Sequence, residues 1–522
     1  MIENPISTHH SDTLFSLIKA LTKAEKRNFK LYANRTQSSS GLKFIQLFDI
    51  LDKQKEPNDE QVLKKISGLN KNQLANMKQH LYRQILKSLR LIHLQKSAEI
   101  DIREQIDYAH ILYGKGLYMQ SLKLLEKYRL VARENHFNIL HLEILEFQKL
   151  IEERHITRSR IVKNRIEKLL RQSEAQSEII NNRCKLANLK IEIHGFYIKY
   201  GHVQNEKDID IVRRLFQTGL KNIKLESLSF YEKIYLHQAY VWYYYILLDF
   251  ENCYSHALKW VKLIEENAHL LDEDPDLYMR GLHYVLTSSY NIKAFDQFHH
   301  YLDHFIKFEK EKRATFNDNS TVLAFLYIQT SSINKHSLMG TFAEGVKIIP
   351  GLLEQLNLYG NKMDIHRVLV FYYKIAYLYV GNENYDKALD YLNAIIDLKA
   401  GNLREDIQNY AHLLSILAHF ELGNYQLLEY MVGKIRRQLS KTKELNAVQR
   451  KTFRFFNNII RKPKSDHMEQ FIKFREEIKK IEHDRLAIRD FIYLDVPAWI
   501  DSKIEKKPMS VIIQERLKRE GH

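Results

Sequence analysis

Six side chains that can contact a nucleic acid recur on one face of a helix that the sequence predicts over residues 71–95. They are Asn72, Asn76, Gln79, Arg83, Lys87 and Arg90. Asn, Gln and Arg can hydrogen-bond base edges, and Lys and Arg neutralise phosphates. The surrounding segment from Gln61 to Ala98 carries eight basic residues and no acidic one. The face therefore predicts contact with a nucleic acid or with an acidic protein partner. An ordinary solvated helix face is the alternative.

The elements that must position this face have the outline of a helix-turn-helix. A helix at about 59–67 and a turn from Ser67 to Asn70 precede the long helix, which is the order of that motif. Lys64 lies where the first helix of the motif usually carries a small packing residue, which weighs against the assignment. Residues 11–95 as a whole predict about five short helices.

One histidine cluster has the spacing of a metal site. His300 and His304 are one helical turn apart, and Asp303 lies beside them; two imidazoles and a carboxylate can bind a divalent ion. With 24 histidines in the chain, such a cluster also arises by chance. We therefore predict no catalytic residues, no metal and no cofactor, and a protein that is not an enzyme.

The composition predicts an all-α protein. The 522 residues include only 17 glycines and 7 prolines, about 3% and 1% of the chain against roughly 7% and 5% in average proteins. Dinucleotide-binding and P-loop folds need glycines at phosphate turns, and all-β folds need Gly and Pro at hairpins. The two cysteines are too few for a disulfide framework or a thiolate zinc site.

Basic character is concentrated in three segments although the whole chain has a formal net charge of +16. Besides the segment from Gln61 to Ala98, Arg154–Arg171 has seven basic residues and one acidic residue, and Lys434–Lys464 has eleven and one. Such segments favour acidic partners, nucleic acids among them.

Residues from about 100 to 460 read as recurring helix pairs. The clearest pair lies at 370–398, where Tyr372, Ala376 and Tyr379 share one face of a first helix. After the turn GNEN, Tyr385 and Ala388 begin the same pattern on a second helix. The small residues suit a close crossing of the two helices, and the aromatic residue suits the turn.

This pattern resembles the tetratricopeptide repeat, and it recurs less perfectly elsewhere. The aromatic residue and its partner three positions later are, in order, Tyr118 and Ser121, Tyr254 and Ala257, Phe295 and Phe298, Phe342 and Gly345, and Tyr425 and Leu428. From Tyr254 onward the aromatic residues are 41, 47, 43 and 40 residues apart, near the range of helical solenoids. The chain also resembles bacterial helical-repeat proteins with a basic helical start. The resemblance implies an α-solenoid and is silent about the ligand.

The sequence thus predicts a basic N-terminal helical domain at 1–98, tetratricopeptide-like helical repeats at 99–464 and capping helices at 465–522. The expected function is a non-enzymatic scaffold that binds a protein or peptide in the groove of a solenoid. The alternative is a nucleic-acid-binding regulator whose repeats sense a ligand or dimerise. The start of the chain lacks the pattern of a signal peptide, and the apolar stretch from Tyr240 to Phe250 is too short to span a bilayer. We therefore expect a cytoplasmic protein without membrane contact.

Overall fold

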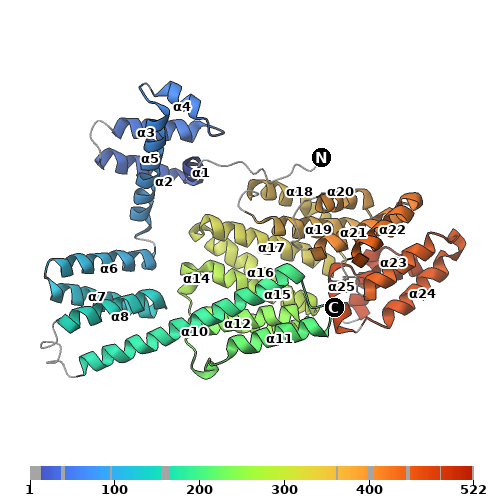
Figure 1. Cartoon of the computed structure of the whole chain (residues 1–522). Helices are drawn as coiled ribbons and strands as arrows, with labels where there is room; N and C mark the ends of the chain where they lie inside the picture. The colour runs from blue at the N-terminus through green and yellow to red at the C-terminus, as the bar shows by residue number, and fades with distance from the viewer. Residues whose placement is uncertain are drawn as a thin grey trace. The chain divides into compact units, whose positions relative to one another are not determined.

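The computed structural model describes most of the chain, and the described part is all-α, as predicted. The described residues are 13–36, 41–66, 68–94, 97–154, 164–359, 363–397, 405–441, 447–482 and 484–519, and they contain helices and turns but no strand. They divide into two compact units, Ser7–Ile180 and Asn181–His522, with the boundary inside one helix, α10 (Arg165–Tyr200). In both units the described elements are helices (Figure 1).

The first unit begins with the five short helices that the sequence predicts. They are α1 (Thr13–Ala20), α2 (Lys23–Thr36), α3 (Gly41–Lys53), α4 (Asp59–Lys65) and α5 (Lys71–His93). Phe29 and Phe48 are buried at their centre with ring centroids 4.9 Å apart. At the start of α2, the Glu25 amide donates to Thr22 Oγ1 at 3.2 Å and the Thr22 amide donates to Glu25 Oε2 at 2.8 Å. This reciprocal capping box satisfies two amides that the helix leaves open.

Three further helices and the first part of α10 complete this unit. They are α6 (Ala98–Gly114), α7 (Tyr118–Glu134) and α8 (Asn138–Arg154), with α7 packed between the other two. Arg129 donates to both carboxylate oxygens of Glu126, at 3.0 and 2.6 Å, and to Gln172 of α10 at 3.2 Å. The Arg129 guanidinium also holds the pKa of Glu126 below its ordinary value.

The second unit is built from helix pairs packed side by side. The pairs are α12 (Phe230–Ile246) with α13 (Phe250–Glu265), α15 (Pro275–Asn291) with α16 (Phe295–Lys312), α17 (Asp318–Leu338) with α18 (Phe342–Tyr359), α19 (Ile365–Gly381) with α20 (Tyr385–Asp397), and α21 (Glu405–Glu421) with α22 (Tyr425–Lys441). From α15 onward, the first helix of each pair contacts its own second helix and the first helix of the next pair. Besides the pairs, α11 (Glu206–Leu220) precedes α12, and the single turn α14 (Leu270–Glu273) lies between α13 and α15.

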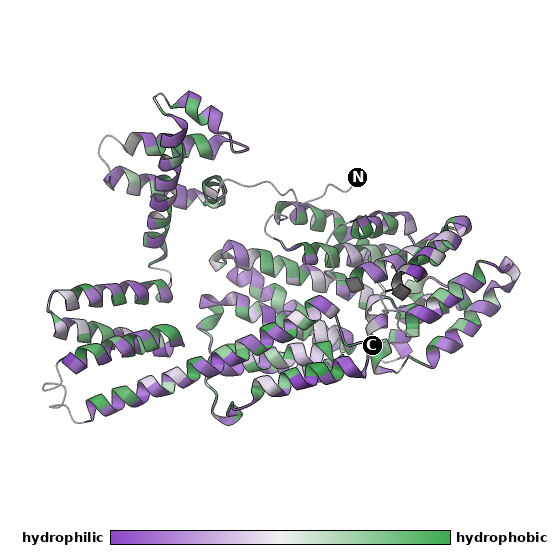
Figure 2. Ribbon diagram, in the orientation of Figure 1, coloured by the Kyte–Doolittle hydropathy of each residue, from purple (hydrophilic) through white to green (hydrophobic). Residues whose placement is uncertain are grey.

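Apolar residues of this unit form one continuous core that runs through all the pairs. Figure 2 shows apolar and polar residues alternating along the helices, as expected for helices that bury one side. Tyr372, Ala376 and Ala388 are buried in this core, and Tyr379 and Tyr385 are partly buried against it. The predicted small and aromatic residues therefore lie where α19 and α20 meet.

The turns within the pairs share one backbone conformation. In each turn a residue with positive φ lies two positions before the second helix: Leu248, Lys293, Gly340, Glu383 and Gly423. Gly116 has the same place in the turn between α6 and α7 of the first unit. The next amide donates to a carbonyl five residues earlier, for example Asn384 to Tyr379 at 2.9 Å and Ala294 to Ser289 at 2.9 Å. This hydrogen bond and the positive φ define a Schellman motif, which closes the first helix.

The shared turn corrects one assignment of the sequence analysis. Tyr254 and Ala257 are not the equivalents of Tyr385 and Ala388, because α13 begins one helical turn earlier, at Phe250. Cys253, which is buried, takes the place of the small residue. The separation between Phe250 and Phe295 is then 45 residues rather than the 41 counted from Tyr254.

Lys293→Gly is expected to raise the free energy of unfolding by about 0.5 kcal/mol. The left-handed conformation costs a residue with a Cβ about 1 kcal/mol, and glycine removes this cost. The greater freedom of glycine in the unfolded chain offsets about half of this stabilisation. Lys293 is exposed, so little packing is lost. Urea unfolding measures the change. Gly423→Ala is the reverse control, because its Cβ would approach only Tyr425, at 4.0 Å; it should destabilise. Equal effects in both variants would contradict this account of the turns.

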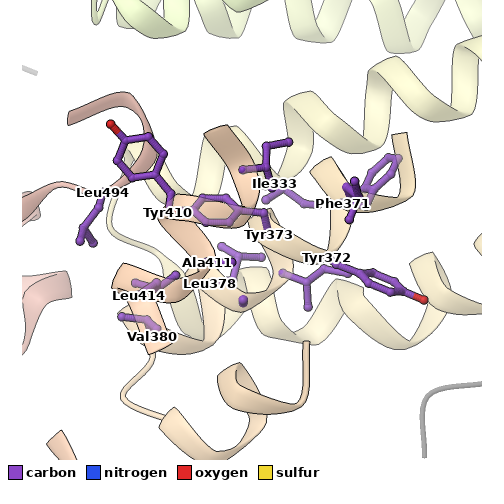
Figure 3. Packing of buried hydrophobic residues seen from close by; sticks show 14 of the residues in the cluster. Ile333, Phe371, Tyr372, Tyr373, Leu378, Val380, Tyr410, Ala411, Leu414 and Leu494 are labelled. Atoms are coloured by element: carbon purple, nitrogen blue, oxygen red, sulfur yellow. The ribbon is translucent and has the colours of Figure 1, made fainter. Parts of the chain in front are cut away.

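The C-terminal helices do more than cover the last pair. They are α23 (Ala447–Ile459), α24 (His467–Lys479), α25 (Arg485–Tyr493), α26 (Val496–Glu505) and α27 (Met509–Arg519). The Tyr373 hydroxyl of α19 donates to the Tyr493 carbonyl at 2.8 Å, and Gln514 of α27 donates to the Gly340 carbonyl at 3.3 Å. Figure 3 shows Tyr373, Tyr410 and Leu494 in one part of the core. The segment therefore returns to pairs that precede it by more than a hundred residues.

Candidate functional site

The structure places the six predicted contact residues on one exposed side of α5. Asn72, Asn76, Gln79, Arg83, Lys87 and Arg90 are all exposed, whereas Leu74, Leu81 and Ile85 on the other side are buried in the core of the first unit. The helix start is well defined, because the Gln73 amide donates to Asn70 Oδ1 at 2.8 Å and the Asn70 amide donates to Gln73 Oε1 at 3.0 Å. The sequence analysis did not predict this second capping box.

Acidic residues compensate only part of the basic surface around α5. Arg90 lies 3.6 Å from Asp107, and Lys78 lies 2.6 Å from Asp59. Arg83 and Lys87 make no ion pair with a carboxylate among the described residues. Together with Lys71 at the start of the helix, they carry the positive charge of α5 that no described carboxylate balances.

The other predicted clusters do not form a site in the described part of the chain. His304 Nε2 forms a hydrogen bond of 2.7 Å with the Tyr278 hydroxyl. His299 Nδ1 forms one of 2.9 Å with the Phe295 carbonyl of its own helix. No group of three or more His, Cys, Asp or Glu side chains that could hold a metal occurs among the described residues. Residues 155–163 and 442–446, within the second and third basic segments, lie outside the described residues.

A chain of aromatic and imidazole rings crosses five helices of the second unit, and the sequence analysis did not find it. We call it the ring row, and its members are His194 of α10, Trp242 of α12, Tyr284 and His283 of α15, Tyr327 of α17 and Arg367 of α19. Successive centroids, ending with the Arg367 guanidinium carbon over the Tyr327 ring, are separated by 4.2, 5.6, 5.4, 4.0 and 5.3 Å. Tyr327 is buried and the other members are half-buried. The row is therefore neither apolar core nor freely solvated surface.

Three more cations lie along the ring row: Lys190 of α10, Arg280 of α15 and Lys374 of α19. Lys374 Nζ donates to Asn334 Oδ1 at 2.6 Å and lies 5.9 Å from the centre of the Tyr290 ring. Among the described residues, none of Lys190, Arg280, Arg367 and Lys374 makes an ion pair with a carboxylate. We refer to these four residues as the row cations.

The environment of the row disfavours additional positive charge. Burial, followed by the charges of Arg367 and Lys374, lowers the pKa of His283 to about 3, so this imidazole is neutral near pH 7. Burial also lowers the pKa of Lys374 to about 8. Burial and then the nearby Arg280 lower the pKa of Lys190. These shifts have the cause expected for cations that are withdrawn from water and have no anionic partner.

No local spacing in the sequence could have revealed the ring row as a whole. Its members come from five helices, and they meet only because the first helices of successive pairs pack side by side. The one local signal was the separation of seven residues between Arg367 and Lys374, which puts both on one face of α19.

Comparisons with known proteins identify no family for this chain. No protein-family model matches the chain, and neither the curated proteins nor the solved structures contain a significant match. Within the described ranges, every helix is too short or too polar to cross a bilayer.

Proposed function

We propose that the protein is a non-enzymatic, cytoplasmic interaction scaffold, in which tetratricopeptide-like helix pairs form an α-solenoid that binds a protein or peptide. The observation that carries this proposal is the ring row. It extends across five helices of the second unit, it is half-buried, and its cations have no described carboxylate partner.

The physics of packed helix pairs supports this role. Side chains that project from a rigid stack keep their positions before a partner arrives, so binding orders few groups of the scaffold. Trp242 and Tyr284 add partly exposed aromatic area, and aromatic and Arg side chains supply much of the binding energy of protein interfaces.

Site-specific crosslinking in the full-length protein tests the proposal. Tyr284 is replaced by the photoreactive p-benzoylphenylalanine, and the control carries the same residue in place of Tyr430 on α22, which is 63% exposed. After irradiation in native lysate, we expect a discrete protein adduct from position 284 and none from position 430. If position 284 gives no protein adduct, or if both positions give the same adducts, the proposal fails.

The exposed face of α5 favours nucleic-acid binding as a second candidate function. Arg83 and Lys87 are exposed without a described acidic partner, and three amide side chains lie on the same face. The test is fluorescence anisotropy of duplex and single-stranded probes with the full-length protein at two salt concentrations. Phosphate contacts predict a salt slope of about −0.9 per neutralised phosphate on duplex DNA.

The matched variants decide whether α5 carries that binding. Arg83→Gln/Lys87→Gln removes two charges from the face, and Lys259→Gln/Lys262→Gln removes two exposed charges from α13. We expect the first pair to lower the affinity and the salt slope and the second pair to leave both unchanged. Absence of binding at low salt, or equal losses in the two variants, rules out this second function.

A further inference from the structure

We infer that the ring row binds an acidic peptide segment, whose carboxylates pair with Arg367, Lys374 and Lys190. This inference rests on the proposed function and names the chemistry of the partner.

The positive charges of the row are not balanced by ion pairs among the described residues. Arg280 lies on α15, Arg367 and Lys374 lie on α19, and Lys190 lies on α10. Burial lowers the pKa of both imidazoles of the row, that of His283 to about 3, so these rings add little positive charge near pH 7. Burial raises the pKa of Asp274, at the start of α15, and the nearby charge of Arg280 acts in the opposite direction. Arg280 therefore has a carboxylate in its neighbourhood. Arg367, Lys374 and Lys190 have no such counterpart. Half-buried cations without counter-ions attract an anionic ligand more strongly than solvated surface lysines do.

Lys374 has neutral neighbours where a carboxylate could bind. Its ammonium group donates to the neutral Asn334 amide and lies beside the Tyr290 ring. A carboxylate at this position would add the attraction between opposite charges to a hydrogen bond that the ammonium group now makes only with a neutral amide. Lys374 therefore has the surroundings of a residue whose strongest partner comes from outside the chain.

The rings favour a peptide over a nucleic acid. Bases bind to proteins by stacking on free aromatic faces. In the row, His283 stacks on Tyr327 at 4.0 Å with an interplanar angle of 10°, and His194 lies 4.2 Å from Trp242. Because these faces already contact one another, they are not free to receive bases, whereas their edges and the separate cations suit aliphatic, aromatic and carboxylate side chains.

The test measures anisotropy of a fluorescein-labelled dodecapeptide of repeated Glu-Glu-Tyr with the purified full-length protein. Matched probes replace Glu by Gln or by Lys, and an oligothymidylate probes the nucleic-acid alternative. Arg367→Gln/Lys374→Gln is compared with Lys259→Gln/Lys262→Gln, which removes the same charge from exposed positions on α13. Arg367→Lys keeps the charge, and thermal unfolding verifies that each variant is folded.

We expect the Glu probe to bind at least about tenfold more tightly than the Gln probe, as for charge-paired interface contacts. The row variant should lose about tenfold or more in affinity, and Arg367→Lys should lose less than Arg367→Gln. Equal binding of the Glu and Gln probes, tighter binding of the oligothymidylate than of the Glu probe, or equal losses in the row and control variants would overturn the inference.

The pH dependence provides a second readout that needs no variant. Raising the pH through about 8 removes the charge of Lys374, so affinity for the Glu probe should fall between about pH 7 and about pH 9, below the range in which an ordinary Lys titrates. His283, with a pKa of about 3, and Tyr290, with a pKa raised by burial to about 12, keep their charge states over this range. The lowered pKa of Lys190 acts in the same direction. A flat profile in this range would contradict the pairing with Lys374.

Failure of this inference is distinguishable from failure of the proposed function. If the Glu probe does not bind preferentially but position 284 still crosslinks to a protein, the scaffold function stands and its partner is not acidic. If position 284 gives no protein adduct either, both proposals fall.

Discussion

Trp499→Ala is expected to lower the free energy of unfolding by about 3–5 kcal/mol, the range for truncation of a large buried aromatic side chain. The Trp499 ring is 2% exposed and contacts rings from three other helices: Phe420 of α21, Phe455 and Phe456 of α23, and Phe471 of α24. Its Nε1 also donates to Glu421 Oε1 at 2.6 Å. Urea unfolding followed by far-UV circular dichroism measures the loss.

Trp499→Phe separates the ring packing from the hydrogen bond. It keeps an aromatic ring but removes the indole N–H, while Lys503 still pairs with Glu421 at 2.7 Å. We expect a loss of about 1.5–3 kcal/mol, the range for one hydrogen bond to a charged group. A loss below about 1 kcal/mol for Trp499→Ala would show that α26 does not pack against these helices as described.

Gly381→Ala is the second variant with a large expected effect, a loss of about 3 kcal/mol. A Cβ at position 381 would overlap the Phe342 ring, which is 1% exposed at the start of α18. The ring lies in the core between two pairs and cannot move without disturbing its neighbours, and overpacking of this kind costs about 1–3 kcal/mol or more. The same unfolding experiment measures it.

Gly351→Ala is the matched control within the same unit. Gly351 lies inside α18, and a Cβ there would meet no atom within 4 Å. Because alanine favours the helix over glycine by about 1 kcal/mol, this variant should gain stability. If both variants were stabilised, the close contact between α19 and the start of α18 would be wrong.

Features that depend on local sequence were predicted well. The all-α class follows from the scarcity of Gly and Pro, and the exposed face of α5 follows from helical periodicity, because both depend on residues within a few turns of one another. The helix pairs were located from the aromatic residue after each turn. The start of the second helix was placed wrongly in one pair, because Phe250 and Tyr254 are both aromatic and one helical turn apart. Spacing alone could not choose between them.

Features that depend on the packing of distant helices were not predicted. The hydroxyl of Tyr373 meets the carbonyl of Tyr493 across 120 residues, and Gln514 meets Gly340 across 174. Nothing near either residue in the sequence indicates its partner. The ring row has the same origin, since Trp242, Tyr284 and Tyr327 come together only when the helices stack.

The returning C-terminal segment has a consequence for how the second unit opens. A stack in which each pair touches only its neighbours can fray from either end, one pair at a time. Here α25 and α27 hold α19 and the turn before α18, so the last pairs cannot separate unless these distant contacts break as well. Amide protons of α21 are therefore expected to exchange with solvent through the same opening as those of α17, and partly frayed forms that expose apolar surface should be rare.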